Sequence, residues 1–213
     1  MDYVLIYKSN ARGTEQMIKL LLLGDTNVGK TSMVYYFSKK KQLNDPMATI
    51  GIDFVPVKNS SNVTYAHVWD TGGLEKYQCI TKHYFSGAHC VMIVYDTTHP
   101  FKSAYEQVAR WYNEITKMCG EIAIDKIPIM IVGNKYDGLN TNTTNICPSL
   151  EPILSRHRSN MTHMYTSAKT GHNIQNAFTN ILCSSSSRMN SPLLNTKTTV
   201  VLERPTQVMH CCY

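Results

Sequence analysis

Hydrophobic positions along this chain fall into two kinds of stretch. Continuous apolar runs of strand length occupy residues 18–23, 90–94 and 127–133, residues 63–69 alternate in character, and residues 162–165 form a further short strand candidate. A continuous run is typical of a strand that is covered on both faces of a parallel sheet. Apolar residues spaced three or four apart predict helices instead, and they occur at Ala104, Val108, Trp111 and Ile115, and at Ile174, Ala177, Phe178 and Ile181. This alternation predicts an α/β fold with a doubly wound, mostly parallel six-stranded sheet flanked by helices.

Two segments are less regular. The first of the two helices is expected over residues 101–119, whereas residues 138–149 are rich in Asn and Thr and predict a loop. A short helix is expected near residues 150–157, although it contains Pro152. Ligands of doubly wound sheets bind at the carboxyl ends of the strands, so the residues that follow each strand are the first candidates for function.

The first apolar run leads into a Gly-x-x-x-x-Gly-Lys-Thr pattern at residues 24–31, and a helix start follows at residues 32–37. A strand, a glycine-rich loop and a helix in this order predict a phosphate-binding loop, because backbone N–H groups and the helix N-terminus both favour an anion. Lys30 is placed to reach the β- and γ-phosphates of a nucleotide, and the Thr31 hydroxyl to ligate Mg²⁺. A glycine turn that binds no ligand is the alternative, which this context disfavours. The candidate phosphate-loop residues are Gly24, Asp25, Thr26, Asn27, Val28, Gly29, Lys30, Thr31 and Ser32.

Further polar residues follow the later strands. Asp70 ends the alternating strand, where it can hold Mg²⁺ through water, and the N–H of Gly73 can reach a γ-phosphate. Asn134-Lys135-Tyr136-Asp137 follows another strand, and the two oxygens of Asp137 match the N1–H and N2–H₂ donors of guanine, which adenine lacks. In Ser167-Ala168-Lys169 the N–H of Ala168 can face the guanine O6. These motifs together predict a site for GTP and GDP.

The chain resembles the Ras superfamily of small GTPases and, within it, the Rab family. The resemblance covers about residues 16–184 and the extreme C-terminus, and it rests on the nucleotide motifs and on residues 49–54, 69–71, 77–81, 84–88 and 94–98. It implies that Thr49 ligates Mg²⁺ in the GTP state, and that Phe54, Trp69 and Tyr84 form an exposed aromatic triad read by effectors. Ordinary packing in the sheet is the alternative for these three rings.

Several positions depart from the family pattern. Leu74 stands where the family has a glutamine that positions the attacking water, and its isobutyl group can neither donate to water nor accept from it, so slow hydrolysis is expected. Gly72 replaces the usual alanine, and two successive glycines predict a looser segment. Gln42 lies where relatives place an aromatic ring against the guanine, so either the affinity for nucleotide is lowered or Leu43 takes over that contact. Leu74 is either a natural divergence or a substitution that locks the GTP form.

Two functions therefore compete. One is a GTP-dependent recruiter of effectors in vesicle traffic with little hydrolysis, and the other is a cycling GTPase enzyme that receives a glutamine from an activating protein. Both imply a monomer that works with an exchange factor and a prenylation escort. An ATP-using enzyme is disfavoured by Asp137.

Composition and charge agree with this interpretation. The expected organisation is an N-terminal extension over residues 1–15, a nucleotide-binding domain over 16–184 and a disordered tail over 185–213. No apolar run approaches the roughly 20 residues of a membrane span. The net charge of +6 comes with no nucleic-acid recognition motif, and the seven cysteines form no zinc or disulfide pattern.

The chain ends Cys211-Cys212-Tyr213, an ending that in Rabs carries two geranylgeranyl groups. Two lipid chains give stable membrane binding where one is marginal, so the resemblance implies the cytoplasmic face of an intracellular membrane. Two incidental cysteines are the alternative.

Overall fold

The structure is a computed structural model that describes residues 17–45, 47, 49, 51–58, 64–72, 85, 87–120, 124–137, 150–156 and 160–189. Its strands are β1 (Ile18–Leu23), β2 (Ile52–Lys58), β3 (Thr64–Thr71), β4 (Cys90–Asp96), β5 (Ile129–Asn134) and β6 (Met161–Tyr165). Its helices are α1 (Lys30–Lys39), α3 (Phe101–Cys119), α5 (Glu151–Arg156) and α6 (Ile174–Met189).

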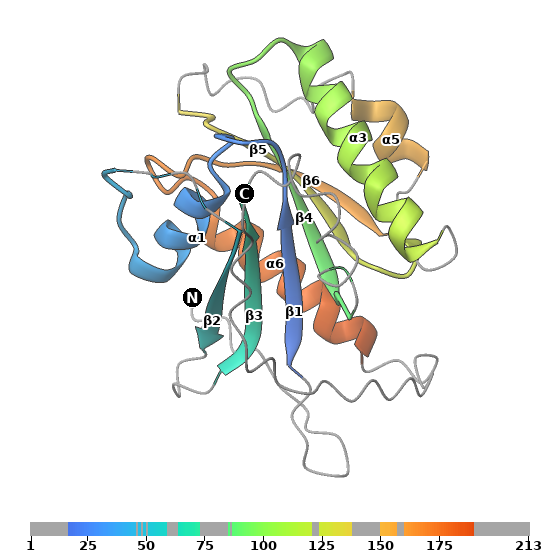
Figure 1. Cartoon of the computed structure of the whole chain (residues 1–213), viewed down its shortest axis with the longest axis horizontal. Coiled ribbons are helices and arrows are strands. Elements are labelled where there is room, and N and C mark those ends of the chain that lie inside the picture. The colour runs from blue at the N-terminus through green and yellow to red at the C-terminus, as the bar shows by residue number, and fades with distance from the viewer. Residues whose placement is uncertain are drawn as a thin grey trace, which may run out of the picture.

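One six-stranded sheet runs through the domain in the order β2-β3-β1-β4-β5-β6 (Figure 1). β2 pairs antiparallel with β3, and the other neighbouring strands pair in parallel. The predicted fold class is therefore confirmed. The carboxyl ends of β1, β4, β5 and β6 share one edge of the sheet, because these strands run in the same direction.

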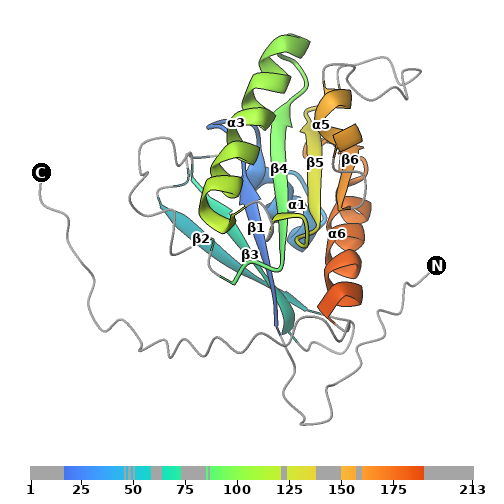
Figure 2. The ribbon, with the colours of Figure 1, turned by 90° about the vertical axis from the view of Figure 1, so that its right-hand side faces the viewer.

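Both faces of the sheet are covered, which explains why β1 is apolar at every position except Lys19. Leu20 and Leu22 pack with residues of α1 and α6, whereas Leu21 and Leu23 pack with residues of α3 and α5. Figure 2 shows α3 on one side of the strands and α6 on the other. Successive side chains of a strand point to opposite faces, so a strand between two helical layers is apolar at nearly every position.

The helical spacings identify the buried faces of α3 and α6. Ala104, Val108, Trp111 and Ile115 of α3 are buried, as are Ile174, Ala177, Phe178 and Ile181 of α6. The ring of Phe178 stacks on Phe37 of α1 with centroids 4.4 Å apart, which fastens the two helices of this face together. The helix expected near residues 150–157 is α5, and Pro152 lies in its first turn, where a missing N–H costs nothing.

The last helix extends past residue 184, the predicted end of the folded domain, because α6 continues through the serine run to Met189. Ser185 is buried and donates from its hydroxyl to the carbonyl of His89, at 3.3 Å. Ser184 and Ser187 donate to the carbonyls of Asn180 and Cys183, one turn earlier. These bonds satisfy the serine hydroxyls inside the helix, where each shares a carbonyl with the backbone.

β2 was not located from the sequence. It contains Pro56, which a central strand would exclude and an edge strand tolerates. The segments 1–15 and 138–149 and the end of the chain from residue 190 lie outside the described residues.

Phe178→Ala is expected to lower the free energy of unfolding by about 3–5 kcal/mol, because it removes a fully buried ring and leaves a cavity between α1 and α6. Urea denaturation followed by circular dichroism measures the loss. The exposed Asn180→Ala on the same helix is the control, and it is expected to change the value by less than about 0.5 kcal/mol. A loss below about 1 kcal/mol for Phe178→Ala would contradict the packing described for this face.

Candidate functional site

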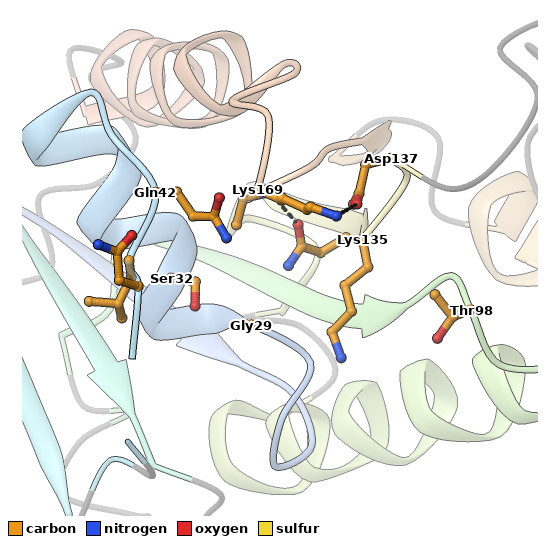
Figure 3. Close-up of a pocket in the computed structure, with 11 residues that line it drawn as sticks. Gly29, Ser32, Gln42, Thr98, Lys135, Asp137 and Lys169 are labelled. Atoms are coloured by element: carbon orange, nitrogen blue, oxygen red, sulfur yellow. Dashed lines mark hydrogen bonds and ion pairs between the residues drawn. The ribbon is translucent and has the colours of Figure 1, made fainter. Parts of the chain in front are cut away.

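A pocket of about 340 Å³ opens at the edge of the sheet where the parallel strands end. The predicted residues that line it are Gly29, Ser32, Asn134, Lys135, Asp137, Ala168 and Lys169. Gln42, Leu43, Asn44 and Thr98 complete the lining. Figure 3 shows these side chains arriving from α1 and from the loops after β4, β5 and β6. Segments more than a hundred residues apart in the chain therefore share one pocket.

The loop between β1 and α1 leaves no room for side chains at its glycines. A Cβ on Gly24 would lie 2.2 Å from the carbonyl oxygen of Val94, and one on Gly29 would lie 2.4 Å from Nδ2 of Asn134. Asn27 adopts a φ of 64°, a conformation that asparagine tolerates better than most residues. The residue types at these positions of the loop therefore suit its backbone conformation.

Lys30 is almost fully buried at the start of α1. Its ammonium group donates to the carbonyls of Gly24 and Asp25, at 2.7 and 2.8 Å. These bonds hold the positive charge over the loop, beside the N-terminus of α1, which also favours an anion. The side chain of Asp25, in contrast, is directed toward α3 and accepts hydrogen bonds from Arg110 and Trp111.

Thr31, Thr49 and Asp70 lie together beside this loop. The hydroxyls of Thr31 and Thr49 are 2.6 Å apart, and Asp70 is buried beside Thr31. Burial raises the pKa of Asp70 to about 6, while hydrogen bonding from Thr31 and the charge of Lys30 oppose the rise. Among the described residues, Oδ1 of Asp70 has no hydrogen-bond partner. Two hydroxyls and an unsatisfied carboxylate oxygen fit Mg²⁺, which prefers oxygen ligands, and a cation there would favour the ionised carboxylate.

No group of three or more His, Cys, Asp and Glu side chains in the described part of the chain could hold a metal ion. A magnesium site here would therefore depend on hydroxyl and phosphate oxygens besides the single carboxylate.

The Asn134 side chain connects three loops around the pocket. Its Nδ2 donates to the carbonyl of Val28 at 2.9 Å, and its Oδ1 accepts from the N–H of Ala168 at 3.1 Å and the hydroxyl of Thr166 at 3.3 Å. Only 1% of Asn134 is exposed, so each of these groups would lose its partner without reaching water if the amide were removed.

The carboxylate of Asp137 is held by two partners from the loop after β6. Oδ1 accepts from the Ser167 hydroxyl at 3.0 Å, and Oδ2 lies 3.6 Å from Nζ of Lys169 (Figure 3). The backbone N–H of Tyr136 donates to the carbonyl of Thr166 at 3.0 Å, which joins the same two loops. The carboxylate is thus oriented at the wall of the pocket.

Asp96 is a functional neighbour that sequence reasoning did not single out. Nζ of Lys135 lies 2.6 Å from its Oδ2, and Thr98 donates to its Oδ1 from both its N–H and its hydroxyl. Burial favours the protonated carboxyl, yet these hydrogen bonds hold the pKa of Asp96 below its usual value. Lys135 is therefore fixed against the end of β4, with its charge partly offset. In the sequence, Asp96 could have been found only from its position within residues 94–98, a stretch that resembles the family.

Gly72 is packed more tightly than the sequence predicted. It is buried, its N–H donates to the carbonyl of Gly51 at 2.8 Å, and a Cβ there would lie 2.1 Å from the carbonyl oxygen of Thr49. The backbone at Gly72 is therefore closely packed, while Gly73 lies outside the described residues, so the predicted looseness of this segment stays a prediction. Its missing side chain lets the segment that carries Thr49 lie directly against the end of β3.

Two rings of the predicted triad lie side by side on β2 and β3. Phe54 is 46% exposed and meets Trp69 edge-on, with centroids 5.3 Å apart. The centroids of the His67 and Phe54 rings are 4.2 Å apart, and the ammonium of Lys19 lies 4.1 Å from the centre of the Trp69 ring. This exposed aromatic surface fits the role that the resemblance implies.

Other predicted residues lie outside the described part of the chain. They are Gly73, Leu74, Tyr84, Cys211 and Cys212. Within the described part, no helix is both long enough and apolar enough to cross a membrane.

The family model of the Ras family matches residues 19–186. GTP-binding protein YPTM2 of Zea mays is 34% identical over 179 residues, which cover 83% of this chain and 84% of the maize protein. Ras-related protein Rab11D of Lotus japonicus is 32% identical over 170 residues, with 79% and 74% covered. Ras-related protein RABG3f of Arabidopsis thaliana is 30% identical over 164 residues, with 76% and 79% covered.

Asn134→Ala is expected to lower the free energy of unfolding by about 2–4 kcal/mol in ligand-free protein, because buried groups of Val28 and Ala168 lose their partners. Chemical denaturation after removal of bound small molecules measures this loss. Asn176→Ala, on the exposed face of α6, is the control and is expected to have little effect. A value for Asn134→Ala as small as that of the control would show that the amide does not hold the loops together.

Proposed function

Because the chain belongs to the Ras family, and within it to the Rab small GTPases, we propose that it is a guanine-nucleotide switch that acts in membrane traffic. The observation that carries this proposal is the Asn134 side chain, which ties the phosphate loop to both loops expected to hold the base. Lys135 and the oriented carboxylate of Asp137 line the pocket, and Lys30 holds its positive charge over the adjoining loop of residues 24–31.

In this proposal the phosphates lie along the loop of residues 24–31, where backbone N–H groups, Lys30 and the N-terminus of α1 favour negative charge. Thr31, Thr49 and Asp70 would hold Mg²⁺, which when bound neutralises phosphate charge. Because Thr49 belongs to the segment before β2, its hydroxyl connects that segment to the phosphate site.

The base would be selected by Asp137. Its carboxylate has two acceptor oxygens, and guanine presents two donors on one edge, whereas adenine presents no such pair. Ser167 and Lys169 orient the carboxylate, while Asn134 fixes the N–H of Ala168 beside it. The pairing of buried polar groups then favours GTP and GDP over adenine nucleotides.

We infer that the chain hydrolyses GTP slowly and acts chiefly by recruiting effectors in its GTP state. Leu74 cannot orient water, so the position that serves hydrolysis in the family is chemically inert here. The alternative is a fully cycling GTPase in which an activating protein supplies the glutamine. Phe54 and Trp69 support an effector surface, to which Tyr84 is proposed to contribute.

Membrane attachment is proposed to depend on Cys211 and Cys212, each carrying a geranylgeranyl group. Two such chains would hold the protein on the cytoplasmic face of an intracellular membrane, and a prenylation escort would return it to the cytosol. An exchange factor would complete the cycle.

Asp137→Asn is expected to weaken GTP binding by about 100-fold or more, because the amide offers guanine one acceptor and one misplaced donor. Xanthine carries a carbonyl in place of the guanine 2-amino group, so xanthosine triphosphate should gain affinity. Equilibrium binding of both nucleotides measures the exchange of preference. Glu106→Gln, an exposed charge change on α3, is the control. Equal loss for both nucleotides, or no loss, would sink the assignment of Asp137 to the base.

Leu74→Gln is expected to speed single-turnover GTP hydrolysis by at least about tenfold, because the carboxamide can donate to the attacking water and accept from it. Leu74→Met, which stays apolar, is the matched control and should leave the rate unchanged. An unchanged rate for Leu74→Gln would refute the assignment of this position to water orientation. Strong hydrolysis by the unsubstituted chain with an activating protein would favour the cycling alternative.

A further inference from the structure

Asp25 joins the phosphate loop to α3. Its Oδ1 accepts from Nε1 of Trp111 at 2.9 Å and also from the guanidinium of Arg110, which forms an ion pair with it. Figure 3 shows the ribbon of the loop passing beside α3. The second residue of the proposed anion-binding loop thus directs its charge toward a neighbouring helix.

The sign of that charge makes its placement important. A nucleotide brings several negative charges to the loop, and a carboxylate that turned toward them would repel them. The indole N–H can only donate, and the guanidinium carries a permanent positive charge, so both groups favour the ionised Asp25 where it lies.

We propose that Arg110 and Trp111 are positioning residues that keep the Asp25 carboxylate away from the bound phosphates and thereby prolong the lifetime of the bound nucleotide. This inference rests on the proposed guanine-nucleotide function, and it assigns to the middle of α3 a role in retaining the ligand. Arg110 and Trp111 act through Asp25, since both donate hydrogen bonds to its carboxylate.

The two donors can be separated from the packing of α3. Trp111 is buried among the apolar residues of this face, so Trp111→Phe keeps a large ring and removes the N–H. The Arg110 side chain is 56% exposed, so Arg110→Gln removes the charge with little effect on packing. Asp25→Asn keeps an oxygen that can accept from the indole and removes the negative charge.

The test is the rate at which a fluorescent GDP analogue leaves the full-length protein in excess unlabelled GDP. We expect release to be about threefold faster in Arg110→Gln, since partly exposed ion pairs contribute modestly. We expect it to be about tenfold faster in Trp111→Phe, which loses a hydrogen bond to a charged group. Both accelerations should fall below about twofold when Asp25→Asn is present, because no carboxylate then remains to be held. Lys117→Gln, which removes an exposed charge on the same helix, should release the analogue at the unsubstituted rate.

Each outcome decides between the inference and the function on which it rests. Equal acceleration with and without Asp25→Asn would mean that the two residues act through packing alone, and it would overturn the inference. Unchanged release in Arg110→Gln and Trp111→Phe would overturn it as well, while binding of the analogue would still support the proposed function. If the unsubstituted protein bound no analogue, both would fall together. Should Trp111→Phe fold poorly, Arg110→Gln with and without Asp25→Asn decides the matter.

Discussion

The site depends on one buried carboxamide. Asn134 ends β5, and its two polar atoms bind groups from the phosphate loop and from the loop after β6. Gly29 makes this possible, because a Cβ there would lie 2.4 Å from the amide nitrogen. Asparagine and glycine are therefore required together: the amide needs the space that the glycine leaves, and the carbonyl of Val28 needs the amide.

β5 places the Asn134 amide at the edge of the sheet. A second glycine, Gly133, leaves room for two neighbouring tyrosine rings. A Cβ on Gly133 would lie 2.7 Å from ring or hydroxyl atoms of both Tyr165 and Tyr95. Because Gly133 has no Cβ, Tyr165 can stack on Tyr136 with centroids 4.5 Å apart. The loop that carries Asp137 therefore rests on the end of β6. The backbone of the base-binding loops is held by packing as well as by hydrogen bonds.

The sequence predicted the helices and strands whose buried residues recur at regular spacing. It missed those that depend on contacts with distant parts of the chain. β1 and α3 end where predicted, because a two-sided strand and a one-sided helix each demand an unmistakable apolar spacing. The end of α6 and the edge strand β2 were missed. Serine is unfavourable inside helices and proline inside strands, unless the surrounding structure accommodates them. The phosphate loop was recognised from its glycines, but the partner of Asp25 lies 86 residues away on α3, and no local pattern records it.

The departures at positions 72 and 74 concern two different steps of the proposed cycle. Gly72 allows the backbone of Thr49 to approach the end of β3, and the hydroxyl of Thr49 reaches that of Thr31 from there. A methyl group at this position, as in relatives with alanine, would require that segment to lie farther out. The glycine thus favours the close approach of the Thr31 and Thr49 hydroxyls, which are proposed to hold Mg²⁺, whereas Leu74 is proposed to affect the removal of the γ-phosphate. Because assembly of the closed site and hydrolysis are separate events, restoring a glutamine at 74 should leave the contact at Gly72 in place. Gly72 and Leu74 would then each lengthen the lifetime of the GTP state independently of the other.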